Sequence, residues 1–76
     1  MATVRVRNPS DAPLNVTLKG SGEQLGVVGA RASVDFLIPP GRYEVTLQGS
    51  GRTQHFYDAP IAEGEVLVLA YSNGGG

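Results

Sequence analysis

The stretch that decides the fold is Ile38–Gly51, IPPGRYEVTLQGSG. It opens with two prolines and a glycine, then alternates apolar and polar side chains until it meets a second glycine turn. Proline fixes φ and glycine allows a positive φ, so the first turn can reverse the chain without help from side chains. Tyr43, Val45 and Leu47 then share one face, which is the period of two that is typical of a half-buried strand. We therefore predict a strand at Arg42–Gln48.

The segment before the proline turn, Ser33–Ile38, has the same period of two. Val34, Phe36 and Ile38 fall on one face of it, and the alternating residues fall on the other face. Two such runs joined by a tight turn are typical of a β-hairpin. We therefore predict that this segment pairs with Arg42–Gln48.

The N-terminal part of the chain predicts a further pair of strands, Thr3–Asn8 and Leu14–Lys19. Between them, residues 8–13 hold two prolines and three turn-forming side chains, which can neither continue a ladder nor nucleate a helix. We expect the two strands to form an antiparallel pair. The side chains that we expect to face the core are Val4, Val6, Leu14, Val16 and Leu18.

Three later segments complete the expected strands. Glu23–Ala32 has the poorest signal, because its glycines would each cost a helix about 1 kcal/mol, and we interpret it as a short, irregular strand. Arg52–Asp58 predicts a strand with Phe56 and Tyr57 on opposite faces. Glu65–Tyr71 is apolar almost throughout, which suits a central strand covered on both faces, or a strand whose outer face meets another subunit.

Together these patterns predict an all-β protein, a small antiparallel β-sandwich of six to seven strands, with a small barrel as the related alternative. No segment combines a helical period with caps at both ends. We expect one domain at residues 1–72 and a flexible glycine-rich tail at residues 73–76.

Length and composition limit the function. A chain of 76 residues buries only about 60% of its unfolded surface, so its core is small. It has no cysteine, so neither a disulfide framework nor a thiolate metal site can compensate for the small core. Association with other chains is then a further source of stability. The net charge of −1 disfavours nucleic acid and anionic membranes as partners.

The sequence also bears on location. No apolar run approaches the roughly 20 residues that span a bilayer, and the N-terminal residues lack the apolar region of a secretory signal. We expect no membrane insertion. As the chain stands, we expect a cytoplasmic or virion location, or an extracellular one if a signal peptide has been removed.

Three segments in the same order carry a resemblance to a known class of domains: VRVRNPSDAPLNVTL, then ASVDFLIPPGRYEVTLQGSG, then IAEGEVLVLAYS. The chain resembles the small prealbumin-like or immunoglobulin-like β-sandwich modules of bacterial surface proteins, with PEGA-type domains as relatives. The specific part is the strand, proline turn and strand at residues 38–47. The resemblance implies a non-catalytic spacer, adhesion or assembly unit, commonly exported, although this chain shows no export signal.

A second resemblance points to RNA binding. The segment TQHFYDAPIAEGEVLVLA is similar to part of the ring-forming tryptophan-responsive RNA-binding attenuation protein. That similarity implies a ring of β-subunits, which would need a repeated basic edge, and the sequence offers no Lys-Lys-Arg group for one. The residues that carry the similarity are Thr53, Phe56, Gly64, Glu65, Val66 and Ala70.

A third resemblance concerns the end of the chain, Gly74–Gly76. It is similar to the glycine tails of ubiquitin-like and sulfur-carrier proteins, whose fold requires a helix across the sheet. The segment available for that helix, Ser21–Ser33, is broken by glycines. A disordered tail or a cloning remnant is the alternative interpretation.

Residue types that could support catalysis or metal binding are few, and we predict no enzyme, no cofactor and no metal. His55 is the single histidine, and its neighbours along the strand face are not strong bases. No serine lies in a Gly-x-Ser-x-Gly elbow, and the glycine-rich turns lack the helix and lysine of a phosphate loop. The carboxylates Asp11, Asp35, Asp58, Glu63 and Glu65 lack calcium-loop spacing.

One group of side chains suits binding. Arg42, Arg52, His55 and Tyr57 lie close together in sequence around one hairpin, and arginine and tyrosine are enriched at interfaces. An ordinary solvated sheet face is the alternative. We expect a structural or protein-binding module that self-associates or docks on a larger assembly, for example a phage capsid decoration or cell-surface subunit.

Overall fold

A computed structural model describes residues 1–20 and 22–71 of the chain. These residues form seven strands and no helix, which confirms the predicted all-β sandwich. The helix that a carrier-like fold requires is thus not found among the described residues. The strands are β1 (Ala2–Arg7), β2 (Leu14–Lys19), β3 (Glu23–Val28), β4 (Ser33–Ile38), β5 (Gly41–Gln48), β6 (Thr53–Ile61) and β7 (Val66–Ala70).

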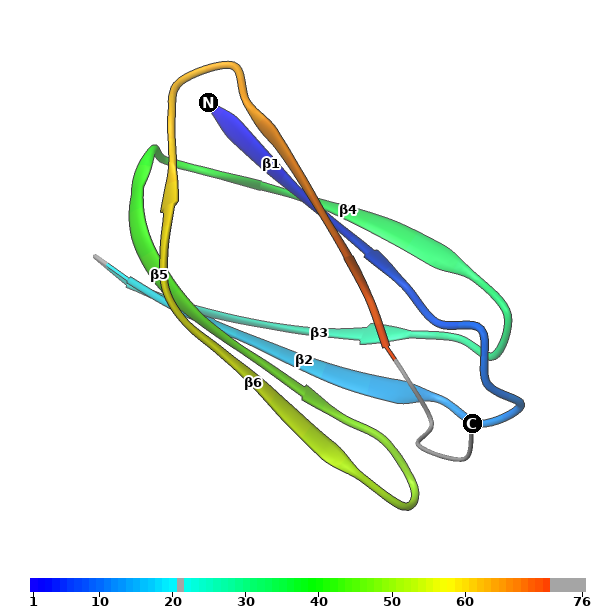
Figure 1. Cartoon of the computed structure of the whole chain (residues 1–76). Coiled ribbons are helices and arrows are strands. Elements are labelled where there is room, and N and C mark those ends of the chain that lie inside the picture. The colour runs from blue at the N-terminus through cyan, green and yellow to red at the C-terminus, as the bar shows by residue number, and fades with distance from the viewer. Residues whose placement is uncertain (21, 72–76) are drawn as a thin grey trace.

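The strands lie in two packed layers (Figure 1). Sheet A has three strands in the order β4-β1-β7, and sheet B has four in the order β3-β2-β5-β6. All neighbours are antiparallel except β1 and β7, which run parallel. The predicted β-sandwich therefore holds, with the N-terminal strand in the centre of the smaller sheet.

The prediction that the first two strands pair with each other is wrong. β1 pairs with β4 and β7, whereas β2 pairs with β3 and β5 in the other sheet. The loop between them carries the chain across the sandwich, and the side chain of Asn8 fixes it by bonds to the β3–β4 turn. A loop with two prolines offers few N–H groups for a ladder, which suits a crossover better than a hairpin.

The predicted hairpin across the proline turn is also wrong. β4 belongs to sheet A and β5 to sheet B, so the Pro39-Pro40-Gly41 turn connects the two layers. Gly41 has a φ of 150° there, which confirms the positive φ expected of this glycine. The hydroxyl of Tyr43 donates to the Pro39 carbonyl at 2.8 Å and ties the start of β5 to the end of β4.

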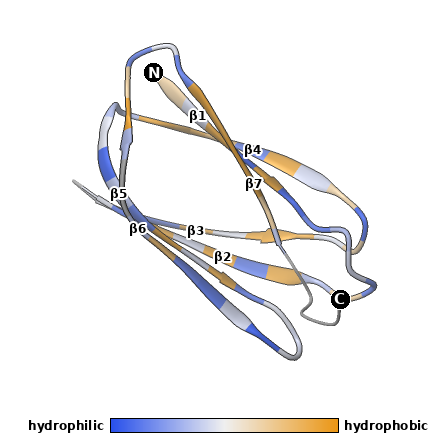
Figure 2. Cartoon of the chain, in the orientation of Figure 1, coloured by the Kyte–Doolittle hydropathy of each residue, from blue (hydrophilic) through white to orange (hydrophobic). Residues whose placement is uncertain are grey.

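The core lies between the sheets and contains every side chain that the period of two placed inward. Figure 2 shows apolar colouring along the strands of both layers. All of those side chains are buried except Val34, which is partly buried and packs against the rest. The buried apolar residues are Ala2, Val4, Val6, Leu14, Val16, Leu18, Val28, Phe36, Ile38, Tyr43, Val45, Leu47, Ile61 and Tyr71.

One glycine allows the two sheets to approach closely. Gly26 lies in β3 opposite Val16, and a Cβ added to it would overlap the ring of Phe36 from β4. The segment that we expected to be irregular is therefore a regular six-residue strand with a glycine where the Phe36 ring needs space.

The last two strands differ from expectation. β6 extends to Ile61 and includes Pro60, which the sequence placed in a connection. β6 is an edge strand, and edge strands are the positions to which proline is largely confined within sheets. β7 is also an edge strand, so the first of the two alternatives for it, a central strand covered on both faces, is wrong.

The predicted tail, residues 73–76, lies outside the described residues. Within the described ranges, no helix has the length and apolar character needed to span a membrane.

Candidate binding surface

The outer face of sheet B holds the two rings of the predicted binding group. His55 and Tyr57 lie two residues apart on β6 and therefore point to the same side. Their rings stack with centroids 5.6 Å apart and planes 16° apart. Tyr57 is 66% exposed, while Phe56 between them packs against the core. The expected division of the two aromatic residues between opposite faces is confirmed.

The two arginines of the group lie at opposite ends of the β5–β6 hairpin. Arg42 is at the start of β5, opposite Pro60, and Arg52 is in the turn that precedes Thr53. Gln48 is the last residue of β5 before the turn that holds Arg52. It is six residues from Arg42, which corresponds to about 20 Å along a strand. The structure thus brings the two rings together and leaves the arginines apart on the same hairpin.

The surroundings of His55 decide which chemistry this face can support. The hydroxyl of Thr46 on β5 lies 3.3 Å from His55 Nδ1, and Tyr57 stacks on the ring. Neither neighbour is a carboxylate or a cationic side chain. The arrangement offers planar, amphipathic contact area, which is what protein interfaces use.

Three carboxylates, those of Asp11, Asp35 and Glu63, form ion pairs on the surface. The side chain of Arg5 bonds Asp35 through Nε at 2.8 Å and Nη2 at 3.1 Å. These hydrogen bonds lower the pKa of Asp35 and raise the pKa of Arg5. Arg31 donates from Nε and Nη2 to a single oxygen of Asp11, Oδ1, and the N-terminal ammonium bonds Glu63.

The side chains that could bind a metal ion lie apart in the described part of the chain. There, no three side chains of histidine, aspartate or glutamate gather in a position to hold a metal ion. The side chain of Asp58, one of the carboxylates considered from the sequence, lies outside the described residues.

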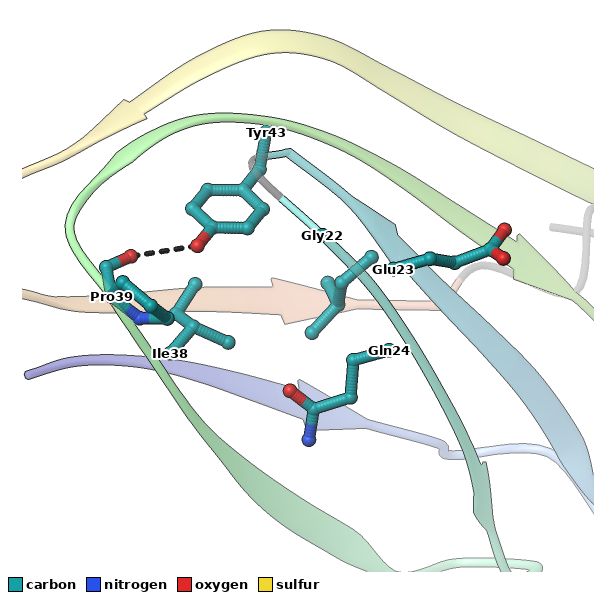
Figure 3. Close-up of a pocket in the computed structure, with 7 residues that line it drawn as sticks. Gly22, Glu23, Gln24, Ile38, Pro39 and Tyr43 are labelled. Carbon is teal, nitrogen blue, oxygen red and sulfur yellow. Dashed lines mark hydrogen bonds between the residues drawn. The ribbon is translucent and has the colours of Figure 1, made fainter.

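Two hollows of about 200 Å³ lie at the ends of the sandwich. The first, shown in Figure 3, opens between the sheets beside the bond from Tyr43 to Pro39. Glu23 and Gln24 supply polar groups in its lining. The second is lined in part by Arg7 and Arg31. Both are smaller than the roughly 300 Å³ at which ligand pockets begin.

Apolar side chains on the outer faces form the remaining candidate surface. Val66 and Val68 of β7 are 49% and 50% exposed and point away from the core, whereas Leu67 and Leu69 pack against it. The apolar run of the sequence predicted this strand as a contact candidate, and its position as an edge strand came only from the structure.

Other exposed apolar side chains escaped the sequence analysis. Leu25 and Val27 lie on the outer face of β3, and they line a shallow hollow of about 400 Å³ on that face. Leu37 is exposed on β4. The signal was present for Leu37, because the alternation places Phe36 and Ile38 on either side of it inward, whereas the glycine-broken segment that holds Leu25 and Val27 gave no such signal.

No protein-family model matches the chain, and comparison with curated proteins and with solved structures likewise gives no match.

Proposed function

We propose that this chain is a non-catalytic structural or protein-binding module that acts by contact, through self-association or as part of a larger assembly. The observation that carries the proposal is the exposure of Val66 and Val68 on an edge strand. Exposed apolar groups that continue along a strand edge are a surface for pairing with another chain.

The size of the core supports the same conclusion. A chain of 76 residues without disulfides gains little from its own core, and association adds buried apolar area. The outer faces of both sheets carry apolar side chains as well as the stacked rings of His55 and Tyr57. An immunoglobulin-like or prealbumin-like unit of a cell surface or capsid would use its sheets in this way.

The experiment is a measurement of mass in solution. The monomer is 7.9 kDa, so light scattering or sedimentation separates it clearly from a dimer or a larger ring. We expect the average mass to rise between about 10 μM and about 1 mM, the range in which weak contacts saturate. A strict monomer over that range would contradict self-association.

A further inference from the structure

The feature that carries this inference is the free edge of β7. β7 is the last strand of sheet A, and its described neighbour in that sheet is β1 alone. A strand in this position presents unpaired N–H and C=O groups along its outer side. The residues that present them can be identified from the hydrogen bonds to β1.

Two backbone hydrogen bonds determine which residues of β7 face β1. Thr3 N donates to the Glu65 carbonyl at 2.9 Å, and Tyr71 N donates to the Arg7 carbonyl at 2.9 Å. In a parallel ladder, alternate residues direct both backbone groups to the same neighbour. Odd-numbered residues of β7 therefore bond β1. The residues that direct their N–H and C=O groups to the free edge are Val66, Val68 and Ala70.

The other three edges carry features that discourage pairing with another chain. β6 contains Pro60, and its ladder with β5 has a register shift. β4 carries the charge of Asp35, and β3 carries Glu23 and the strand-weakening Gly26. Charges, prolines, bulges and irregularities are the means by which proteins protect sheet edges.

The edge of β7 lacks every one of these features. Its five residues, Val66–Ala70, are valine, leucine or alanine, and Figure 2 colours the strand as hydrophobic. It is the one edge among the described strands with neither a charged side chain nor a proline or glycine.

We propose that β7 pairs antiparallel with β7 of a second copy of this chain, about a twofold axis at Val68. This inference rests on the proposed function and names its surface and partner. Val68 faces Val68 of the second copy, and Val66 faces Ala70. The three free-edge residues of one copy therefore lie opposite the three free-edge residues of the other. Each facing pair exchanges two hydrogen bonds, and the two three-stranded sheets become one sheet of six strands.

The charges at the two ends of β7 favour the antiparallel direction. Glu63 and Glu65 precede the strand, and because the N-terminal ammonium pairs with Glu63, the carboxylate of Glu65 leaves this end with a net negative charge. Arg7 lies beside Ala70 at the other end, and the hydroxyl of Tyr71 bonds the Arg52 carbonyl there. Antiparallel pairing places the acidic end of one copy beside the basic end of the other, whereas a parallel arrangement would bring like charges together.

The interface is a single strand pair with its flanking side chains, which is small. Interfaces that bury less than about 1,200 Å² belong to weak and transient complexes. We therefore expect a monomer–dimer equilibrium with a dissociation constant of about 10 to 100 μM. An assembly that needs reversible contacts between identical units would suit that strength.

Sedimentation of the full chain and two matched variants tests the surface. Val68→Lys places two like charges at the twofold axis, and we expect at least a tenfold weaker dimer. Val27→Lys makes the same change at an exposed valine of the edge strand β3, and we expect a dimer as strong as that of the natural chain. Far-ultraviolet circular dichroism confirms that both variants are folded.

The outcomes separate this inference from the proposed function. Loss of the dimer in Val68→Lys alone supports the pairing. A natural chain that associates, together with a Val68→Lys variant that associates as well, would overturn the β7 pairing and leave self-association standing. A natural chain that is monomeric at about 1 mM would overturn both.

A covalent test reports on the register. The chain has no cysteine, so Val68→Cys provides a single thiol per copy. Facing residues in a hydrogen-bonded antiparallel pair have Cα atoms about 5.5 Å apart, within the range that a disulfide spans. We expect rapid oxidation to a disulfide-linked dimer for Val68→Cys and slow oxidation for Val27→Cys. Equal rates for the two variants would overturn the register.

Discussion

Replacing Asn8 by alanine should be among the most damaging single changes in this protein. Asn8 is 1% exposed and is the one buried polar side chain among the described residues. Its Nδ2 donates to the carbonyls of Ala12, Val28 and Gly29 at 2.8, 3.2 and 3.0 Å. Its Oδ1 accepts from the backbone N and the hydroxyl of Ser10, at 3.1 and 2.6 Å.

The magnitude follows from the groups that lose their partners. A buried polar group left unsatisfied costs about 1 to 3 kcal/mol. The bond to Val28 is buried, whereas the other groups are part-buried and can regain water. We therefore expect Asn8→Ala to lower the free energy of unfolding by about 2 to 4 kcal/mol. Proteins of this size have about 4 to 11 kcal/mol in total, so the loss is a large fraction.

Urea denaturation followed by circular dichroism measures this loss, with Asn15→Ala as the control. Asn15 is exposed on the outer face of β2, and its replacement should change the free energy of unfolding by less than about 0.5 kcal/mol. The melting temperature of Asn8→Ala should fall by at least about 8 °C. If Asn8→Ala matched the control, the buried amide would not be what fixes the crossover loop.

A second substitution tests the direction of the hydrogen bonds. Asn8→Asp places a carboxylate oxygen where Nδ2 now faces three carbonyls. The charged form is disfavoured there, so the pKa of this carboxyl should be raised in the folded state. Because the folded pKa would exceed the unfolded one, this variant should lose stability relative to the natural chain as the pH rises from about 4 to 7. An unchanged difference between pH 4 and pH 7 would contradict this assignment.

Two further predictions concern the packing and the surface charges. Gly26→Ala should cost about 1 to 3 kcal/mol, because the added methyl group overlaps the ring of Phe36, whereas Gly29→Ala, with open space around it, should be tolerated in the same urea titration. Asp35→Asn should lower the melting temperature at pH 7 because it removes the ion pair with Arg5. The pKa of Asp35 is lowered in the folded state, so this contribution is present above about pH 4 and disappears as the pH falls through the lowered pKa, and high salt should reduce it.

The sequence predicted which side of each strand faces the core, and it did not predict which strands are neighbours. Alternation in β1 placed Val4 and Val6 inward and the arginines outward, as the structure has them. Alternation says nothing about the neighbour, since each strand could complete several pairs with equal burial. The two expected hairpins failed for this reason.

The residues of the two crossover loops bear on which strands are neighbours, which the period of two does not indicate. In the loop after β1, Asn8 bonds carbonyls of the β3–β4 turn, which is about 20 residues away in sequence. In the turn after β4, Pro39 and Pro40 have no N–H groups to donate to a ladder. A proline-rich loop between two predicted strands can therefore be either a hairpin turn or a crossover from one sheet to the other. Long-range hydrogen bonds of a polar side chain in the loop distinguish the two.

The binding group was only partly predictable for a similar reason. His55 and Tyr57 stack because two residues separate them on one strand, and that spacing is visible in the sequence. Arg42 and Arg52 are near them in sequence as well, but the length of β5 separates the two arginines. Closeness in sequence becomes closeness in space along a face only over a few residues of a strand.

The apolar run of β7 illustrates a general limit on such reasoning. A strand that is apolar on both faces has the same sequence whether its own chain or a second copy covers the outer face. Among the residues that the structure describes, none covers this outer face, because Val66 and Val68 on it are half exposed. The other three edge strands each contain a charged residue, a proline or a glycine. β7 is therefore the edge strand of this sequence that lacks protection against pairing. The pairing between copies that we propose would give both the edge and the valines a partner.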